Sequence, residues 1–153
     1  MGRFNGWNEK NMPVIEKFNS VLIGIDPGTK TGVAVKENGK LIRVETMTIF
    51  QAIEVVLAWE RTCLALDKPL LVRVEDARLR TYFGNTGREI LQGAGSVKRD
   101  CAIWQEVLEE RAIHHQFVHP QNVKATTAKQ FEQITGWKKQ TSIHAREAAW
   151  LVT

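Results

Sequence analysis

Runs of apolar, strand-forming residues alternate with polar turn signals in the first third of the chain. Three such runs span about 20–26, 31–37 and 40–48, and Asn38-Gly39 separates the last two. Asn-Gly between apolar runs is a strong hairpin signal because both residues tolerate positive φ. Pro27-Gly28-Thr29-Lys30 links the first two runs. The pattern therefore predicts an antiparallel meander of three strands.

Beyond residue 48 the apolar spacing changes to that of helices. Helices are predicted over about 49–66, 86–111 and 127–135 and from 143 to the end of the chain, with strands over 70–75 and 115–118 between them. The segments Thr48–Gln51 and Thr86–Glu89 have the capping-box form that starts a helix. Ser142 caps the last helix and Gly136 ends the one before it. This order of elements indicates an α/β fold with a mixed sheet.

The longest predicted helix carries one continuous apolar seam. Its members lie four and three residues apart: Ile90, Ala94, Val97, Cys101, Trp104 and Leu108. Packing against the sheet is favoured over a protein partner as the reason for this seam. Gly93 and Gly95 beside it permit close approach of another backbone, which keeps a second copy of the chain as the alternative.

The composition is that of an ordinary globular domain. The 153 residues are 43% hydrophobic and 25% charged, and the formal net charge of +4 leans towards a polyanionic partner. No apolar run reaches the roughly 20 residues of a membrane span, and the first residues have no signal-peptide core. Residues 1–19 lack periodicity and are predicted to be a flexible extension of one domain over 20–153. Cys63 and Cys101 are interpreted as buried thiols of a reducing, cytoplasmic compartment.

Two apolar strands end in carboxylates, Asp26 and Glu75. Groups at the ends of adjacent strands in an α/β sheet converge in one crevice. The final helix adds His144 and Glu147, which are three residues apart and so lie on one helical face. Each signal alone is ambiguous, because a strand-end Glu is more often on the surface and a helical His-x-x-Glu is more often salt-bridged. Their joint arrangement carries the interpretation.

Carboxylates with one imidazole favour Mg²⁺ or Mn²⁺, and Mn²⁺ tolerates the imidazole better. Paired divalent ions about 3.5–4 Å apart activate water and stabilise the leaving oxygen in phosphodiester hydrolysis. Asp26, Glu75, His144 and Glu147 are therefore the candidate ligands and catalytic residues of a divalent-metal site of the kind that hydrolyses phosphodiesters.

The order of these motifs resembles that of RuvC-type Holliday junction resolvases, within the RNase H-like superfamily. The similar segments are Ile23–Thr29, Val74–Asp76, Leu91–Gly95, Val123 with Lys124, and His144 with Glu147. The first two resemble the motifs that carry the first two acidic residues of that family, and the last falls where it carries a pair of acidic residues on the final helix. The resemblance spans about residues 20–152.

The resemblance implies an RNase H-like fold with a mixed five-stranded sheet, three antiparallel strands and then two parallel ones, with helices on both faces. It also implies a Mg²⁺- or Mn²⁺-dependent endonuclease that acts as a homodimer on branched DNA, the four-way junction. Asp26 would bridge two metals, with Glu75, His144 and Glu147 as further ligands. His144 stands where many members have Asp, and Glu147 is one methylene longer than the usual Asp. The short length and the lack of other domains favour a resolvase encoded by a phage or mobile element and acting in a bacterial cell.

Basic and aromatic residues follow the proposed ligands along the chain. The loop after Glu75 contains Arg78, Arg80, Tyr82, Phe83 and Arg88, a second basic cluster contains Lys124, Lys138 and Lys139, and Lys30 lies in the turn after Asp26. Arginine and lysine neutralise phosphates, and aromatic rings stack on exposed bases. These residues are the candidate DNA contacts, with a solvated surface as the alternative for each cluster.

Three rival functions stay open. The first is a junction-binding protein of the same fold with weakened catalysis. The second is a related RNase H-like nuclease that acts on other branched DNA or on RNA. The third is an actin-like ATPase or sugar kinase, because Gly24–Thr29 also resembles their first phosphate loop. That last reading is disfavoured, since those proteins need two such domains and this chain has room for one.

Overall fold

The computed structural model of the chain describes residues 19–80, 88–123 and 125–153. The predicted extension therefore lies outside the described residues, apart from Asn19. The strands are β1 (Val21–Asp26), β2 (Thr31–Glu37), β3 (Lys40–Met47), β4 (Leu70–Glu75) and β5 (His115–Val118). The helices are α2 (Ile49–Ala65), α3 (Arg88–Glu110), α4 (Ala128–Thr135) and α5 (Ile143–Trp150), with short 3₁₀ turns η1 (Ala77–Leu79) and η2 (Pro120–Asn122).

The strands form one mixed sheet in the order β3-β2-β1-β4-β5. β1 pairs antiparallel with β2, and β2 with β3, whereas β1 with β4 and β4 with β5 are parallel. Asn38 (φ 50°) and Gly39 (φ 81°) make the tight turn between β2 and β3. The predicted meander, and the predicted mixed five-stranded α/β fold, are confirmed.

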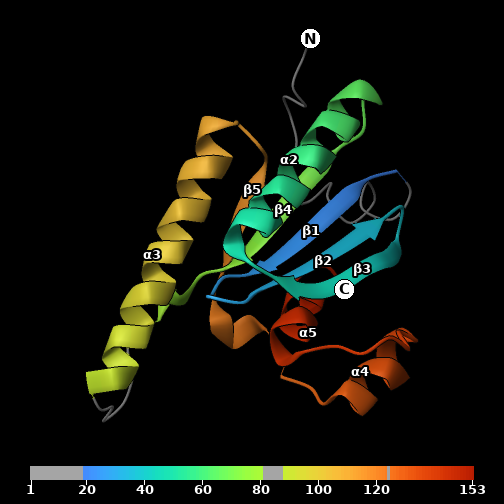
Figure 1. The fold of residues 1–153 in the computed structure, drawn as a ribbon. Coiled ribbons are helices and arrows are strands. Elements are labelled where there is room, and N and C mark those ends of the chain that lie inside the picture. Colours follow the sequence, from blue (N-terminus) through green and yellow to red (C-terminus); the bar gives the residue numbers. More distant parts are fainter. Residues whose placement is uncertain (1–18, 81–87, 124) are drawn as a thin grey trace.

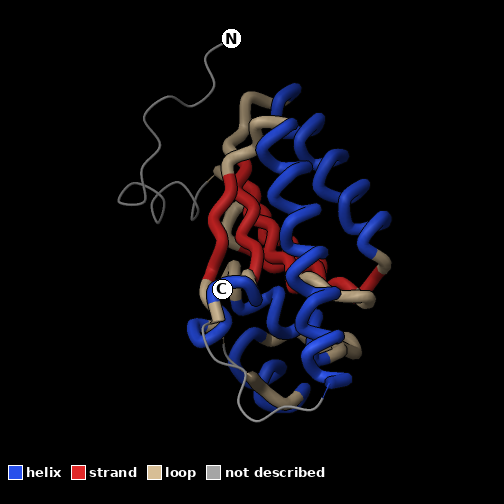
Figure 2. Tube along the Cα trace, turned by 90° about the vertical axis from the view of Figure 1, so that its left-hand side faces the viewer, coloured by secondary structure: helices blue, strands red, loops and turns tan. Residues whose placement is uncertain are grey.

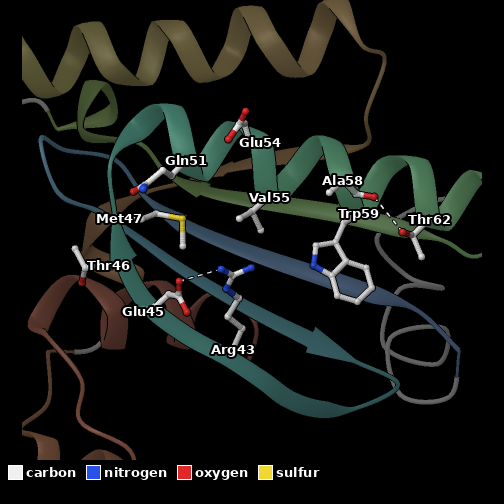
Figure 3. A pocket seen from close by; sticks show the side chains of 10 residues that line it. All are labelled: Arg43, Glu45, Thr46, Met47, Gln51, Glu54, Val55, Ala58, Trp59 and Thr62. Atoms are coloured by element: carbon white, nitrogen blue, oxygen red, sulfur yellow. Dashed lines mark hydrogen bonds and ion pairs between the residues drawn. The ribbon is translucent and has the colours of Figure 1, made fainter.

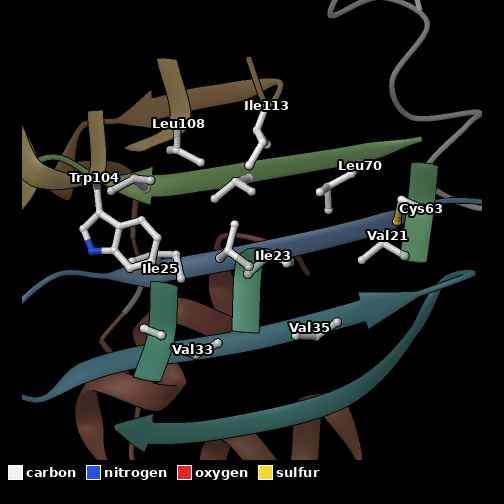
Figure 4. Close-up of a cluster of buried hydrophobic side chains, with 14 residues drawn as sticks. Val21, Ile23, Ile25, Val33, Val35, Cys63, Leu70, Trp104, Leu108 and Ile113 are labelled. Atoms are coloured by element: carbon white, nitrogen blue, oxygen red, sulfur yellow. The ribbon is translucent and has the colours of Figure 1, made fainter. Parts of the chain in front are cut away.

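α2 and α3 cover one face of the sheet, and α5 covers the other (Figures 1 and 2). On the first face, Trp104 and Leu108 of α3 join residues of α2, β1 and β4 in one buried core (Figure 4). The described part of the apolar seam therefore packs against the sheet, as favoured above. A second core contains Phe131 of α4 and Ala148 of α5. The side chains of residues 88–94, which include Gly93, lie outside the described residues.

Local signals place the helix ends largely as predicted. Thr48 and Gln51 form a reciprocal capping box at the start of α2. The Ser142 side chain accepts a hydrogen bond from a backbone amide at the start of α5, and Gly136 closes α4 in the left-handed conformation. The predicted cap at Thr86 lies outside the described residues.

The two cysteines are free and buried, as predicted. Burial raises the pKa of Cys63 and of Cys101 to about 11, so both stay protonated thiols at neutral pH. Across the described part of the chain, every helix is too short or too polar to cross a bilayer.

The last helix is shorter than predicted. α5 ends at Trp150 instead of running to the end of the chain. Leu151 and Val152 are 6% and 2% exposed and belong to the second core. Arg73 of β4 donates a hydrogen bond to the Leu151 carbonyl at 3.1 Å. The Thr153 hydroxyl donates to the Ala149 carbonyl, so side-chain donors from outside the helix satisfy its end, which periodicity alone does not reveal.

Two glycines let α5 lie directly on the sheet. A Cβ atom at Gly24 of β1 would overlap the carbonyl oxygen of Ala148, and one at Gly32 of β2 would overlap that of His144. Both neighbours are backbone atoms, which cannot move aside without shifting the helix. Glycine is therefore required at these two positions because any side chain would lift α5 from the sheet.

We expect Gly24→Ala and Gly32→Ala each to lower the free energy of unfolding by about 1–3 kcal/mol or more, the cost of overpacking a dense core. Gly95→Ala is the matched control, because a Cβ at Gly95 in α3 meets no atom within 4 Å. Alanine there should stabilise the helix by up to about 1 kcal/mol. Urea unfolding monitored by circular dichroism measures all three variants. Equal stability of parent and Gly24→Ala would contradict the close approach of α5.

Candidate metal centre

Asp26 ends a strand that is buried along its whole length. Asp26 as a whole is 7% exposed, and its backbone pairs with Gly32 of β2. In the following turn the Thr31 hydroxyl donates to the Gly28 carbonyl at 3.0 Å. The buried strand and the closed turn together hold the Asp26 carboxylate at one point, at the end of the sheet that meets α5.

Two side chains of α5 approach this carboxylate. His144 Nδ1 lies 2.7 Å from Asp26 Oδ2 and 3.8 Å from Glu147 Oε2. The His144 side chain is 52% exposed and that of Glu147 24%, whereas that of Asp26 is 10% exposed. The cluster is therefore buried on the sheet side and open to solvent on the helix side. The predicted His-x-x-Glu face does meet the predicted strand-end carboxylate.

Glu75 ends β4, the parallel neighbour of β1. Ile25 of β1 is in register with Val74 of β4. Asp26 and Glu75, the next residue of each strand, therefore lie at the same end of the sheet. Glu75 Oε2 is buried and has no hydrogen-bond partner among the described residues. A buried carboxylate oxygen without a partner is costly unless a proton or a cation compensates it.

The crowding of carboxylates perturbs their protonation. Burial, then the charge of Glu75 and hydrogen bonding with Glu147, raise the pKa of Asp26 to about 10. Burial also raises the pKa of Glu75, although its contact with Asp26 opposes the shift. The proton that Asp26 keeps at neutral pH relieves repulsion that a bound cation would relieve in its place.

The donor set fits a divalent metal ion. Ligand atoms of Asp26, His144 and Glu147 all lie within 4.8 Å of one another. Glu75 is not one of these three, but it ends the neighbouring strand, and its Oε2 has no partner among the described residues. Hard carboxylate oxygens with one imidazole suit Mg²⁺ or Mn²⁺ better than a soft metal.

Contacts on both sides of α5 hold its ligands in place. At its start, the Ser142 hydroxyl forms a short hydrogen bond with the Thr46 hydroxyl of β3. Arg146 is 7% exposed and donates to the carbonyls of Thr126 at 2.8 Å and Thr141 at 2.9 Å. These bonds fasten α5 to the edge strand and to the segments that flank α4.

Four of the candidate DNA contacts are described with their side chains as solvent-facing residues. Lys30 is exposed in the turn after Asp26, and Arg80 is exposed after η1, where its charge acts on Glu75. Lys138 and Lys139 are exposed between α4 and α5, and Lys139 Nζ lies 5.7 Å from the Trp137 ring centroid. Exposure leaves these cations accessible to a phosphate backbone.

Arg78 differs from the other candidates because its guanidinium is already engaged within the chain, by Asp76 and Gln105. Tyr82, Phe83 and Lys124 lie outside the described residues, and so does the side chain of Arg88. Their contact with DNA stays a prediction.

A separate groove of about 660 Å³ lies between β3 and α2 (Figure 3). Its lining includes Arg43, Glu45, Val55 and Trp59, and none of the four proposed metal ligands. The Arg43 and Glu45 side chains at its edge pair with each other at 2.9 Å. The groove is thus distinct from the carboxylate cluster.

Three residues were not identified from the sequence, although their hydrogen bonds tie together segments beside the cluster: Thr46, Asp76 and Arg146. Thr46 and Arg146 act through contacts between segments far apart in the chain, for which the sequence carries no signal. Asp76 had a local signal, because Asp directly after a strand favours a turn in which its side chain accepts from the amide two residues later, as it does from Arg78.

The fold itself has a counterpart among solved structures. No family model and no curated protein sequence matches the chain. Among solved structures, the chain is similar to T. thermophilus RuvC in complex with a Holliday junction substrate, with a TM-score of 0.55 and 20% sequence identity. The match covers 87% of this chain and 90% of that one. The two proteins therefore share a fold.

Proposed function

We propose that the chain is a divalent-metal-dependent endonuclease that cleaves branched DNA, with the four-way junction as its substrate. The observation that carries the proposal is the cluster of Asp26, His144 and Glu147 at the end of the sheet where Glu75 also ends its strand. There the strongly raised pKa of Asp26 and an unpartnered oxygen of Glu75 indicate missing positive charge. Likeness in fold to a junction-bound RuvC supports the choice of substrate.

Each residue has a distinct role in this proposal. Asp26, the most central and most buried ligand, would bridge two ions, and Glu75 would complete one side of the site. His144 and Glu147 would close the solvent-facing side, where the scissile phosphate must enter. Bound ions would activate water and stabilise the leaving oxygen. The close contact of α5 with the sheet keeps these ligands from moving apart during the reaction.

The substrate contacts follow from the charge around the cluster. Lys30 and Arg80 are exposed and follow β1 and β4 along the chain, and Lys138 and Lys139 precede α5. Phosphates that contact these side chains would lie at the mouth of the cluster. Resolving a four-way junction requires two cuts, so the proposal includes a homodimer with one such site in each copy.

We expect Asp26→Asn to slow single-turnover cleavage of a four-way junction by more than about 100-fold, because the amide keeps the volume but cannot supply the bridging charge. Junction binding in EDTA should be retained. Glu110→Gln is the matched control, because this exposed carboxylate lies at the far end of α3. The assay uses Mg²⁺ and Mn²⁺ in turn, with duplex DNA, flaps and structured RNA as competitors.

Three outcomes would count against this account. A parent protein that cuts nothing with either metal would leave a junction-binding role at most. Faster cleavage of RNA or of flaps than of the junction would show that the four-way junction is not the preferred substrate. Undiminished cleavage by Asp26→Asn would remove the cluster from the chemistry.

The raised pKa of Asp26 predicts an inverse dependence of stability on pH. Folded Asp26 keeps its proton up to about pH 10, whereas the ordinary value is 3.8. The folded state therefore binds more protons in this window, and the contribution of Asp26 to the free energy of unfolding falls as pH rises. In EDTA, we expect the melting temperature of the parent, minus that of Asp26→Asn, to fall between about pH 5 and about pH 8.

Metal binding should show the opposite trend. Because a cation must displace the proton on Asp26, stabilisation of the parent by Mg²⁺ should grow as pH rises. Asp26→Asn should show little of this growth. A difference in melting temperature that stays constant or rises with pH would contradict the protonation of Asp26.

A further inference from the structure

Asp76, directly after the proposed ligand Glu75, is the centre of a second charged network. Asp76 is 3% exposed. Its Oδ1 accepts hydrogen bonds from the Arg78 backbone amide at 3.0 Å and from Arg78 Nε at 2.9 Å, and its Oδ2 accepts from Arg78 Nη2 at 2.9 Å. Burial would raise the pKa of Asp76, but the hydrogen bonds from Arg78 outweigh it and lower that pKa. Asp76 and Arg78 therefore form a bidentate ion pair with a buried carboxylate.

The same guanidinium reaches two further elements. Arg78 Nη1 donates to Gln105 Oε1 of α3 at 2.8 Å, and Gln105 Nε2 donates to Glu109 at 2.8 Å. The guanidinium carbon also lies 5.0 Å from the centroid of the Phe117 ring of β5. Arg78 therefore joins the segment after β4 to both α3 and β5.

This network surrounds the backbone of Glu75. The Cys101 thiol of α3 donates weakly to the Glu75 carbonyl at 3.8 Å, and the Asp76 amide donates to the Val118 carbonyl of β5 at 2.8 Å. Glu75 Oε2 itself has no hydrogen-bond partner among the described residues. The backbone of Glu75 is therefore fixed on both sides, and of its side-chain oxygens only Oε2 is buried without a partner in the described part of the chain.

We propose that Arg78 is a positioning residue that acts through Asp76 to hold Glu75 at the metal centre, and is not a phosphate contact. The proposal rests on the proposed function of that centre. Three donor groups of Arg78 are already used within the chain, and its side chain is 28% exposed. A phosphate that drew the guanidinium away from this geometry would leave Asp76 as a buried charge without its cation, which is strongly unfavourable.

The test compares Arg78→Gln, Arg78→Lys and Asp76→Asn with Arg80→Gln, whose exposed side chain remains a candidate phosphate contact. We expect Arg78→Gln and Asp76→Asn each to slow single-turnover junction cleavage at saturation by about 10–100-fold, as for groups that orient a metal ligand. Their junction affinity and its salt dependence should equal those of the parent. Arg78→Lys should be nearly as slow, because an ammonium keeps the charge but loses the fork. Arg80→Gln should instead reduce the salt slope by about one.

A second readout does not depend on cleavage. Titration calorimetry with Mn²⁺ alone, without DNA, should show weaker binding by Arg78→Gln and Asp76→Asn than by the parent, by about 10-fold or more. If these variants fail to fold, Gln105→Ala replaces them, because it removes the α3 anchor and leaves the Asp76–Arg78 pair intact. It should slow cleavage by a few-fold, without a change in junction affinity.

Several results would overturn the positioning role. One is a weaker, less salt-dependent junction affinity in Arg78→Gln with unchanged cleavage at saturation. Another is unchanged Mn²⁺ affinity and cleavage in the Arg78, Asp76 and Gln105 variants of an active parent. A parent that neither binds Mn²⁺ nor cleaves would reject the metal centre itself, and the positioning role with it, which distinguishes failure of the proposed function from failure of this inference alone.

Discussion

The site depends on how closely one short helix approaches the sheet. The backbone of α5 lies against β1 and β2 where Gly24 and Gly32 present no side chain. That contact sets the height of the helix, and the hydrogen bond between Ser142 and Thr46 sets its start at the edge strand. These two contacts fix the position of α5, and in that position the His144 side chain faces Asp26. A helix carried higher by a single methyl group would move both of its ligands away from the strand ends.

The same approach creates an electrostatic problem that a metal centre would solve. Asp26 and Glu75 are brought to one end of the sheet by parallel strands, and α5 adds Glu147 above them. Repulsion and burial hold a proton on Asp26 at neutral pH and leave one oxygen of Glu75 without a partner. The free energy gained by burying the apolar cores thus offsets the cost of bringing these carboxylates together. Such a cost is typical of functional sites, where strain and charge are kept for the ligand.

Much of this arrangement is predictable from the sequence because its signals are local. The apolar runs, the Asn38-Gly39 turn and the helix caps locate nearly every element, and the positions of Asp26 and Glu75 at strand ends predict their convergence. The end of α5 was not predicted because Arg73, which donates to it, comes from another element.

Arg78 shows the limit of prediction more clearly. In the sequence it is an arginine in a basic loop, which suits a phosphate and an internal carboxylate equally well. Only the fold places Nε and Nη2 of this guanidinium on buried Asp76 and Nη1 on Gln105 of α3. Gly24 and Gly32 are similar cases, because the sequence around them does not indicate which helix packs against them. Contacts between distant segments decide the role in each case.

The central proposal is that Asp26 would bridge two divalent ions, with Glu75, His144 and Glu147 as the further ligands. Crystals soaked in Mn²⁺ and measured at the manganese absorption edge test it most directly, through the anomalous difference density. The account predicts two peaks about 3.5–4 Å apart, both within coordination distance of Asp26. A saturating soak that leaves no peak at Asp26, or that places Mn²⁺ only on residues outside these four, would contradict it.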